Sequence, residues 1–213
     1  MNGRPTCAAL ALVGLTGCAA YSGGARSVDP ATLTSSPGWV SAAPTPVLRQ
    51  EGEYDCGAAS LAMVAGRWHL PLSVDAAHAA LPESTPQGTR LGDLRDAARA
   101  HGLAAFAIAG DRDTVVYELR AGRPVILGLL LPYGPNQAKS HYEVVVGAHL
   151  EDGLFLTIDP ASGAKVRSWA ALDAEWHPAG RPALVVLGPS QFIASRPRSE
   201  GRAPPEHQGP QRE

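Results

Sequence analysis

The sequence lacks several features that would each assign it to a class of proteins. No apolar run in its 213 residues reaches the roughly 18 residues that a transmembrane helix needs. Charged residues are scarce, at 18%, and balance to a formal net charge of −2, so no basic surface predicts a nucleic-acid partner. Neither an internal repeat nor a P-loop for nucleotide phosphates is present. The length instead fits one folded domain with extensions.

Cysteine is also scarce, and the first two of the three cysteines lie in a segment typical of secreted proteins. MNGRPT carries one arginine, CAALALVGL is a short apolar run, and LTGCAA follows with small residues. LTGC, which ends at Cys18, resembles the lipobox of bacterial lipoproteins. The resemblance implies a signal peptide over residues 1–17, lipidation of Cys18, and attachment to a membrane. Because Ala19 rather than aspartate follows, it implies an outer-membrane anchor facing the periplasm.

The third cysteine, Cys56, is then the only thiol left in an oxidising compartment. It has no partner for a disulfide, and a free thiol is a liability there unless it is useful. Taken alone, Cys56 is also compatible with a small buried residue that fills a core.

Composition divides the mature chain into three parts. Residues 18–46 are rich in Gly, Ser, Thr and Pro and show no periodicity, so we expect a lipidated cysteine followed by a flexible linker. Residues 190–213 are rich in Pro, Arg and Glu and are expected to be a disordered tail. The domain itself is predicted over residues 47–189.

Within this domain the hydrophobic pattern predicts helices first and an antiparallel sheet second, which is an α+β fold. The 56–68 helix is apolar on nearly every side, so it should be buried between two layers. The expected helices are residues 56–68, 73–81, 90–102, 113–122 and 168–176, and the expected strands are residues 103–108, 124–131, 141–149, 154–159 and 182–188.

A cysteine at the beginning of a buried helix has a chemical consequence. The unpaired N–H groups of the first turn and the helix dipole favour the thiolate of Cys56 over the thiol. A thiolate that attacks a carbonyl needs an acid for the leaving amine, for which histidine is the usual choice. It also needs donors for the oxyanion and a polar group that orients the imidazole. Asp55, directly before the cysteine, is expected to cap the helix.

Three residues could supply these groups. Gln50 precedes Cys56 by six residues in a glycine-containing loop, so its amide could fold back toward the helix. His141 opens the apolar stretch HYEVVVG, where a polar residue is out of character, and Asp159 ends the next strand. Strands joined by a hairpin lie about 4.8 Å apart, so His141 and Asp159 could meet across them.

The register of that hairpin is open in the sequence. A two-residue turn at 152–153 would place Asp159 opposite Val146. Bringing Asp159 to His141 needs a wider loop or a bulge.

The quoted motifs resemble the C39 family of cysteine peptidases, the bacteriocin-processing peptidases of papain-like fold. The resemblance is carried by QEGEYDCGAASLAMV, GTRLGDLRDAARAHGL, HYEVVVG and DPASG. It implies that Cys56 is the nucleophile, His141 the acid and base, Asp159 its orienting partner and Gln50 an oxyanion donor. Family members process double-glycine leader peptides as part of ABC exporters, whereas this sequence has no ATPase motif and carries a lipoprotein signal.

We therefore predict a lipid-anchored cysteine peptidase that cleaves a peptide or protein substrate through a thioester acyl-enzyme. The remaining histidines show no metal-ligand spacing, so neither a metal nor a cofactor is expected. An exporter or envelope partner is compatible with the resemblance but is not identified by the sequence. Two alternatives stay open: a transpeptidase or amidase, in which an amine takes the acyl group, and a peptide-binding module without turnover.

Overall fold

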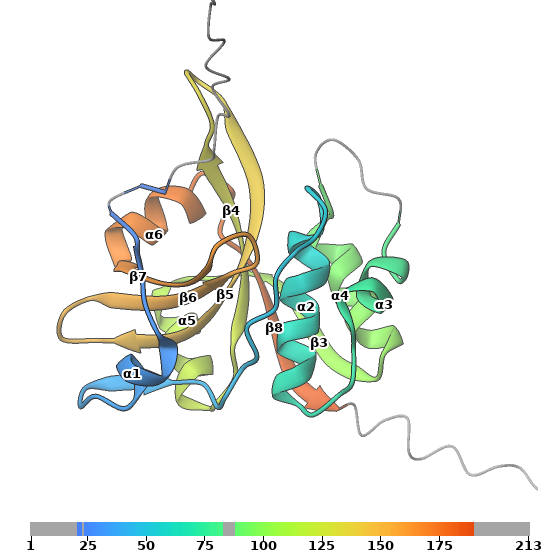
Figure 1. Ribbon diagram of the computed structural model, residues 1–213, viewed down its shortest axis with the longest axis horizontal. Helices are drawn as coiled ribbons and strands as arrows, with labels where there is room; N and C mark the ends of the chain where they lie inside the picture. The colour runs from blue at the N-terminus through green and yellow to red at the C-terminus, as the bar shows by residue number, and fades with distance from the viewer. Residues whose placement is uncertain (1–20, 23, 83–87, 190–213) are drawn as a thin grey trace, which may run out of the picture.

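The computed structural model describes residues 21–22, 24–82 and 88–189, so the expected signal peptide, Cys18 and the C-terminal tail lie outside the described residues (Figure 1). The fold is an antiparallel sheet with helices on both faces. Its strands have the order β1-β7-β6-β5-β4-β8-β3, with β2 paired to β5 beside this path. The predicted α+β class is confirmed. The strands are β1 (Arg26–Ser27), β2 (Trp39–Ser41), β3 (Leu103–Ala109), β4 (Val125–Pro132), β5 (Ala138–His149), β6 (Leu154–Asp159), β7 (Gly163–Ser168) and β8 (Pro182–Pro189).

Helices α2, α3 and α4 pack on one side of the sheet, and α5 and α6 lie on the other side (Figure 1). Each side has its own hydrophobic core cluster. No helix among the described residues is long and apolar enough to cross a bilayer. The helices are α1 (Pro30–Thr34), α2 (Cys56–Arg67), α3 (Val74–Ala79), α4 (Leu91–Ala100), α5 (Arg112–Arg120) and α6 (Trp169–Trp176).

Helix α2 is the buried centre of the helical half, as its apolar composition predicted. Ten of its twelve residues are buried. Leu61 and Met63 are fully buried, and each such side chain contributes about 1.5–3 kcal/mol relative to exposure. Gly57 allows close packing at its first turn, because a Cβ there would lie 3.2 Å from Leu94 and 3.4 Å from Tyr142. The helix is thereby fixed against both α4 and β5.

The β5–β6 hairpin resolves the register that the sequence left open. Its last pair is His149 with Leu154, so residues 150–153 form the loop, and a bulge at Val146 shifts the register farther along. Val144 pairs with Ile158, which leaves Asp159 beside Glu143 at the end of β6. His141 is two residues farther along β5 on the same face. The turn expected between these strands is present, and the register left open by the sequence combines a loop wider than two residues with a bulge.

The expected flexible linker is wrong for residues 24–46, because this segment is part of the fold. Asp29 caps α1 by accepting from the Ala31 N–H, and Pro30 occupies the first turn. Strand β1 pairs with β7, and β2 pairs with β5. Trp39 packs against the core cluster on the α2 side. Burial of apolar side chains at intervals along this Gly- and Pro-rich stretch is enough to fix it.

Candidate active site

Cys56 is the first residue of α2, and its thiol is free and only 9% exposed. Asp55 occupies the N-cap position, but the expected capping hydrogen bond is absent. Its carboxylate instead accepts from the Gly52 N–H at 2.7 Å and contacts the His78 ring at 2.8 Å. The first-turn N–H groups of α2 are therefore not capped by this side chain, and the positive end of the helix faces the sulfur.

His141 and Asp159 lie side by side beneath the surface. His141 Nε2 lies 2.7 Å from Asp159 Oδ1, and both residues are buried. They come from β5 and β6, two strands that the bulged hairpin holds in register. The structure thus brings together the two residues that the sequence placed in adjacent strands.

The electrostatics of His141 favour the protonated ring. Burial alone lowers the pKa of His141, but hydrogen bonds with Asp159 and with Cys56, together with the charge on Cys56, raise it to about 10. Charge on Glu143 adds to the increase. Asp159 and Cys56 thus both favour the charged ring, and a pKa of about 10 keeps the imidazole protonated at neutral pH.

Asp159 is an ionised carboxylate surrounded by donors. Oδ1 accepts from the Ala161 N–H at 2.8 Å as well as from His141, and Oδ2 accepts from Lys165 at 3.1 Å and from the Ser162 hydroxyl. Burial raises the pKa of Asp159, but hydrogen bonding and charge from His141 and the Ser162 hydroxyl hold it well below its usual range. The carboxylate can therefore fix the ring and keep it charged.

A cluster of His141, Glu143 and Asp159 has ligand atoms within 4.8 Å of one another, the spacing of a metal site. Both carboxylates already have cationic partners, however. Lys165 Nζ lies 3.1 Å from Asp159, and Arg167 lies 3.0 Å from Glu143. Since two protein cations neutralise this cluster, its chemistry does not call for a metal ion.

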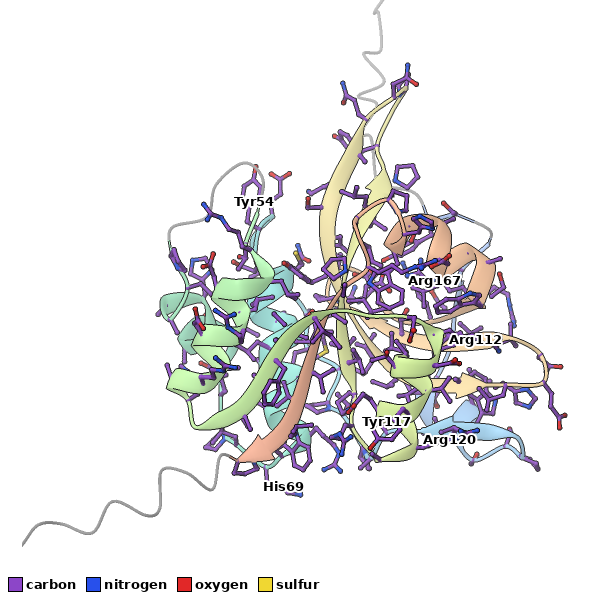
Figure 2. The ribbon with its side chains drawn as sticks, turned by 180° about the vertical axis from the view of Figure 1, so that it is seen from behind. Tyr54, His69, Arg112, Tyr117, Arg120 and Arg167 are labelled. Carbon is purple, nitrogen blue, oxygen red and sulfur yellow. The ribbon has the colours of Figure 1, made fainter. Side chains whose placement is uncertain are left out.

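Sequence reasoning missed the residues that enclose Asp159 from the N-terminal side and from β7. The Tyr21 hydroxyl donates to Asp159 Oδ2 at 2.5 Å, and Lys165 Nζ lies 3.3 Å from the centre of the Tyr21 ring. Arg167 also pairs with Glu175 beneath α6 (Figure 2). Tyr21 gave no signal because it falls in the segment expected to be a linker. Lys165 and Arg167 lie two residues apart on β7 and therefore point to the same face, so this buried face shows no hydrophobic pattern in the sequence.

Gln50 lies in the loop before α2, and its backbone N–H donates to Pro160 O at 3.0 Å. Its side-chain amide donates to Gly52 O at 2.9 Å, and its buried Oε1 has no partner among the described residues. In this conformation the amide is turned toward its own loop. The same amide also donates to Glu53 O at 3.5 Å, so an oxyanion role requires it to leave these partners in its own loop.

Two adjoining cavities flank the residues expected to be catalytic. Gln50, His141 and Asp159 line one of about 620 Å³, and Cys56 lines the other, of about 320 Å³. Both are bordered by Glu53 and Lys139, whose ion pair of 2.9 Å joins the loop before α2 to β5. A peptide could therefore lie across the catalytic residues with a cavity on each side.

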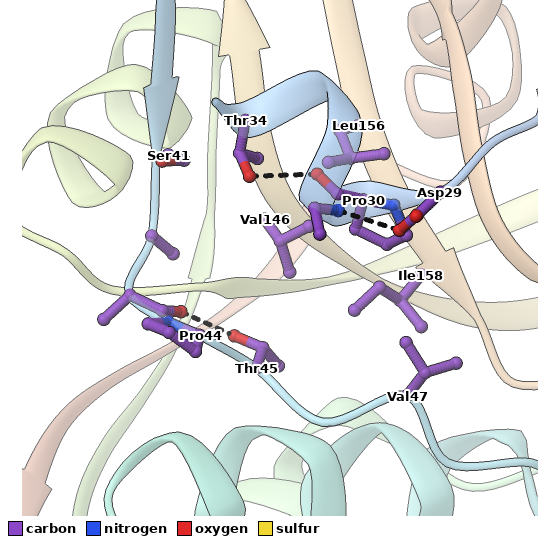
Figure 3. Close-up of a pocket in the computed structure, with 13 residues that line it drawn as sticks. Asp29, Pro30, Thr34, Ser41, Pro44, Thr45, Val47, Val146, Leu156 and Ile158 are labelled. Carbon is purple, nitrogen blue, oxygen red and sulfur yellow. Dashed lines mark hydrogen bonds between the residues drawn. The ribbon is translucent and has the colours of Figure 1, made fainter. Parts of the chain in front are cut away.

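A third cavity, of about 530 Å³, lies away from this chemistry (Figure 3). Its walls come from α1, residues 41–47 and the β5–β6 pair. Its acidic residue, Asp29, already caps α1, and none of the expected catalytic residues lines it. The 620 Å³ and 320 Å³ cavities are therefore the candidate active site.

The arrangement supports nucleophilic chemistry. A thiol at a helix N-terminus, an imidazole whose pKa that cysteine raises and a carboxylate bonded to the ring are the parts needed for attack on a carbonyl and protonation of a leaving amine. Gln50 is the expected member whose side chain the structure does not direct at the sulfur.

Comparisons with known proteins agree with this geometry. A sequence model described as "Peptidase C39 family" matches residues 44–180. The fold is similar to a double-glycine motif protease from an AMS/PCAT transporter, solved with a leader peptide (TM-score 0.54, 20% identity, 68% of this chain and 93% of that one). It is also similar to the peptidase domain of Streptococcus ComA, a bifunctional ABC transporter of a quorum-sensing pathway (0.57, 23%, 70% and 100%).

A third similar structure is described as a C39-like peptidase from Bacillus anthracis (TM-score 0.58, 16% identity, 72% of this chain and 99% of that one). At these identities the likeness concerns the fold. No curated protein matches the sequence.

Proposed function

Because this chain belongs to the peptidase C39 family, we propose that it is a cysteine peptidase that cleaves a peptide bond through a thioester with Cys56. The observation that carries the proposal is the position of His141. Its ring lies 2.7 Å from Asp159, and Cys56 is among the groups that raise its pKa. This is the order of nucleophile, acid and orienting carboxylate that the reaction needs.

Each residue has a defined step. The Cys56 thiolate attacks the carbonyl carbon, and the oxyanion is held by N–H groups at the start of α2 and by the Gln50 amide once it leaves Gly52. His141 gives its proton to the leaving amine as the C–N bond breaks and the thioester remains. His141, now neutral, takes a proton from water, whose oxygen attacks the thioester. The acid product leaves, and the thiolate and imidazolium are restored.

The substrate that we propose is a peptide or an extended segment of a protein. One structurally similar protease is solved with a leader peptide, which supports a peptide ligand for this fold. The adjoining cavities of about 620 and 320 Å³ offer space on both sides of the catalytic residues. The lipoprotein signal argues for a substrate at the cell envelope, so a double-glycine leader is not part of the proposal.

We also propose that Cys18 is acylated and holds the enzyme at the outer membrane, facing the periplasm. The support is the LTGC sequence, which ends at Cys18. Metabolic labelling with a clickable fatty acid should mark the wild type and not Cys18→Ser. Equal labelling of the two proteins would end this part of the proposal.

The catalytic proposal is tested with a peptide vinyl sulfone, which alkylates an activated thiolate. We expect rapid labelling of the wild type and none of Cys56→Ala, with mass spectrometry locating the adduct on Cys56. Comparison of periplasmic peptides from wild-type and Cys56→Ala cells then identifies the substrate. Slow labelling would favour a binding module, and transfer of the acyl group to an added amine in preference to water would favour a transpeptidase.

A further inference from the structure

The N-terminal segment around Tyr21 lies outside residues 44–180, the part that matches the family, yet it reaches the catalytic centre. Tyr21, Gly24 and Ala25 line the same cavity as His141 and Asp159. Strand β1, which follows, pairs with β7 at the edge of the sheet (Figure 1). The segment is thus one wall of the active site, supplied by a part of the chain that the family match does not include.

The ring of Tyr21 is held by two cations. Lys165 Nζ lies 3.3 Å from the ring centre, and Arg167 Cζ lies 4.9 Å from it. Next along the chain, the Ser22 N–H donates to Glu175 at 2.5 Å. Cation–π contacts with partly desolvated side chains favour one ring position. The contact with Asp159 is therefore made by a side chain that β7 and α6 fix in place.

The two oxygens of Asp159 have different partners. Oδ1 faces His141, whereas Oδ2 accepts from the Tyr21 hydroxyl at 2.5 Å, from Lys165 at 3.1 Å and from Ser162. Three donors on Oδ2 prevent the carboxylate from rotating about its Cβ–Cγ bond. They also withdraw negative charge from the oxygen that faces the imidazole.

We propose, on the basis of the peptidase function above, that Tyr21 is a positioning residue: its hydroxyl orients Asp159 toward His141 and limits how strongly this carboxylate retains the imidazole proton. An imidazole that holds its proton too strongly is a poor acid for the leaving amine. Tyr21 thus acts on the reaction through Asp159 without touching the substrate.

Other charged groups also face the His141–Asp159 pair and contribute to the pKa of His141 in the wild type. They are Cys56 from α2, Glu143 on β5, Lys165 and Arg167 on β7, and Glu175 on α6. Removing the Tyr21 hydroxyl alone leaves each of these charged residues in place. The direction of the effect on His141 therefore reports on that hydroxyl.

The test is Tyr21→Phe in the full chain, which keeps the ring between its two cations and removes one donor. We expect kcat to fall about tenfold, or about 1.4 kcal/mol, with KM changed less than about twofold. We expect the pKa of His141 to rise, measured by ¹⁵N chemical shifts of the imidazole between pH 8 and 11. Ser162→Ala, which removes another donor from Oδ2, should move the pKa of His141 in the same direction.

Tyr117→Phe is the matched control, because Tyr117 is 66% exposed on α5 and does not reach the site (Figure 2). It should leave both readouts unchanged. An unchanged His141 titration in Tyr21→Phe would overturn the proposal. A lowered pKa would also overturn it, since a loosened structure weakens the His141–Asp159 contact.

The titration needs no substrate, so it separates this proposal from the peptidase function. If the wild type hydrolysed no peptide while Tyr21→Phe raised the pKa of His141, the peptidase proposal would fail. The effect of the Tyr21 hydroxyl on His141 through Asp159 would stand. If hydrolysis were normal and the pKa of His141 did not respond, only the Tyr21 proposal would fail. Circular dichroism melting checks that each variant is folded.

Discussion

Asp159→Asn changes one charge at nearly constant size, so its effect follows from the hydrogen bonds. Both carboxylate oxygens accept from donors, including His141, the Ala161 N–H and Lys165. An asparagine amide places an NH₂ group at one of these positions, where it faces donors instead of acceptors. An uncharged amide could still hold the imidazole of a papain-like enzyme through its oxygen. Its NH₂ group would then face Lys165, a donor, and could not accept the hydrogen bond that Oδ2 accepts here.

The largest cost comes from Lys165, which is buried and loses its carboxylate. Removing one partner of a buried ion pair costs about 3–5 kcal/mol. We therefore expect Asp159→Asn to lower the free energy of unfolding by about 4 kcal/mol, a large part of the stability of an average domain. Adding Lys165→Met removes the unpaired charge, and the double variant should recover more than about 1 kcal/mol.

The loss should depend on pH in a defined way. The pKa of Asp159 is lowered in the folded state, so its contribution is present above the unfolded value near pH 4 and is lost as the pH falls. The pKa of His141 is raised, so its contribution is complete below about pH 6.5 and is lost as the pH rises through about 10. The difference between wild type and variant is therefore largest between about pH 4 and 6.5.

Urea denaturation followed by circular dichroism at pH 5.5, 7 and 9.5 measures this difference. The reasoning would be refuted if Asp159→Asn lost less than about 1 kcal/mol at pH 5.5 and Lys165→Met restored nothing. The same variant should lower the pKa of His141, because Asp159 is the first of the partners that raise it.

Three further substitutions test other parts of the structure. Arg167→Met should cost about 3–5 kcal/mol in thermal or urea unfolding, because it leaves two buried carboxylates without their cation; a change below about 1 kcal/mol would show that the pairs are not buried. Gly57→Ala should destabilise by about 1–3 kcal/mol, since the added Cβ lies 3.2 Å from Leu94. Lys139→Ala breaks an exposed pair with Glu53 and should change stability by less than about 1 kcal/mol while altering KM for the peptide; an unchanged KM would argue against a substrate path past this pair.

The elements that the sequence predicted best are those with a clear hydrophobic period. Helix α2 has apolar residues on nearly every side, and β6 matches the predicted strand residue for residue. The hairpin register could not be predicted, because an Asp-Gly pair fits a four-residue loop such as 150–153 as well as a two-residue turn. The bulge at Val146 shifts the pairing, and nothing in an unbroken run of valines marks it.

Strand β7 and the N-terminal elements were missed for a different reason. In β7 all three central positions are buried, and two of them hold Lys165 and Arg167, whose partners are carboxylates on other elements. A search for hydrophobic periodicity does not detect a strand in which one buried face consists of charged residues paired with opposite charges on other elements. Tyr21 shows the same limit, because one tyrosine in a Gly- and Ser-rich segment is informative only once Asp159 is beside it.

The position of Tyr21 affects how far the domain could lie from the proposed lipid anchor. A flexible linker over residues 18–46 would have let the domain move tens of ångströms from a lipidated Cys18. With Tyr21 held at Asp159, only two residues lie between Tyr21 and the proposed anchor at Cys18, and an interval of three positions spans at most about 11 Å. The anchor as proposed would place the Tyr21 side of the 620 Å³ cavity at the bilayer surface. Together with the proposed acylation of Cys18, the position of Tyr21 would favour substrates whose cleavage site lies close to the membrane, such as the juxtamembrane segments of other envelope proteins.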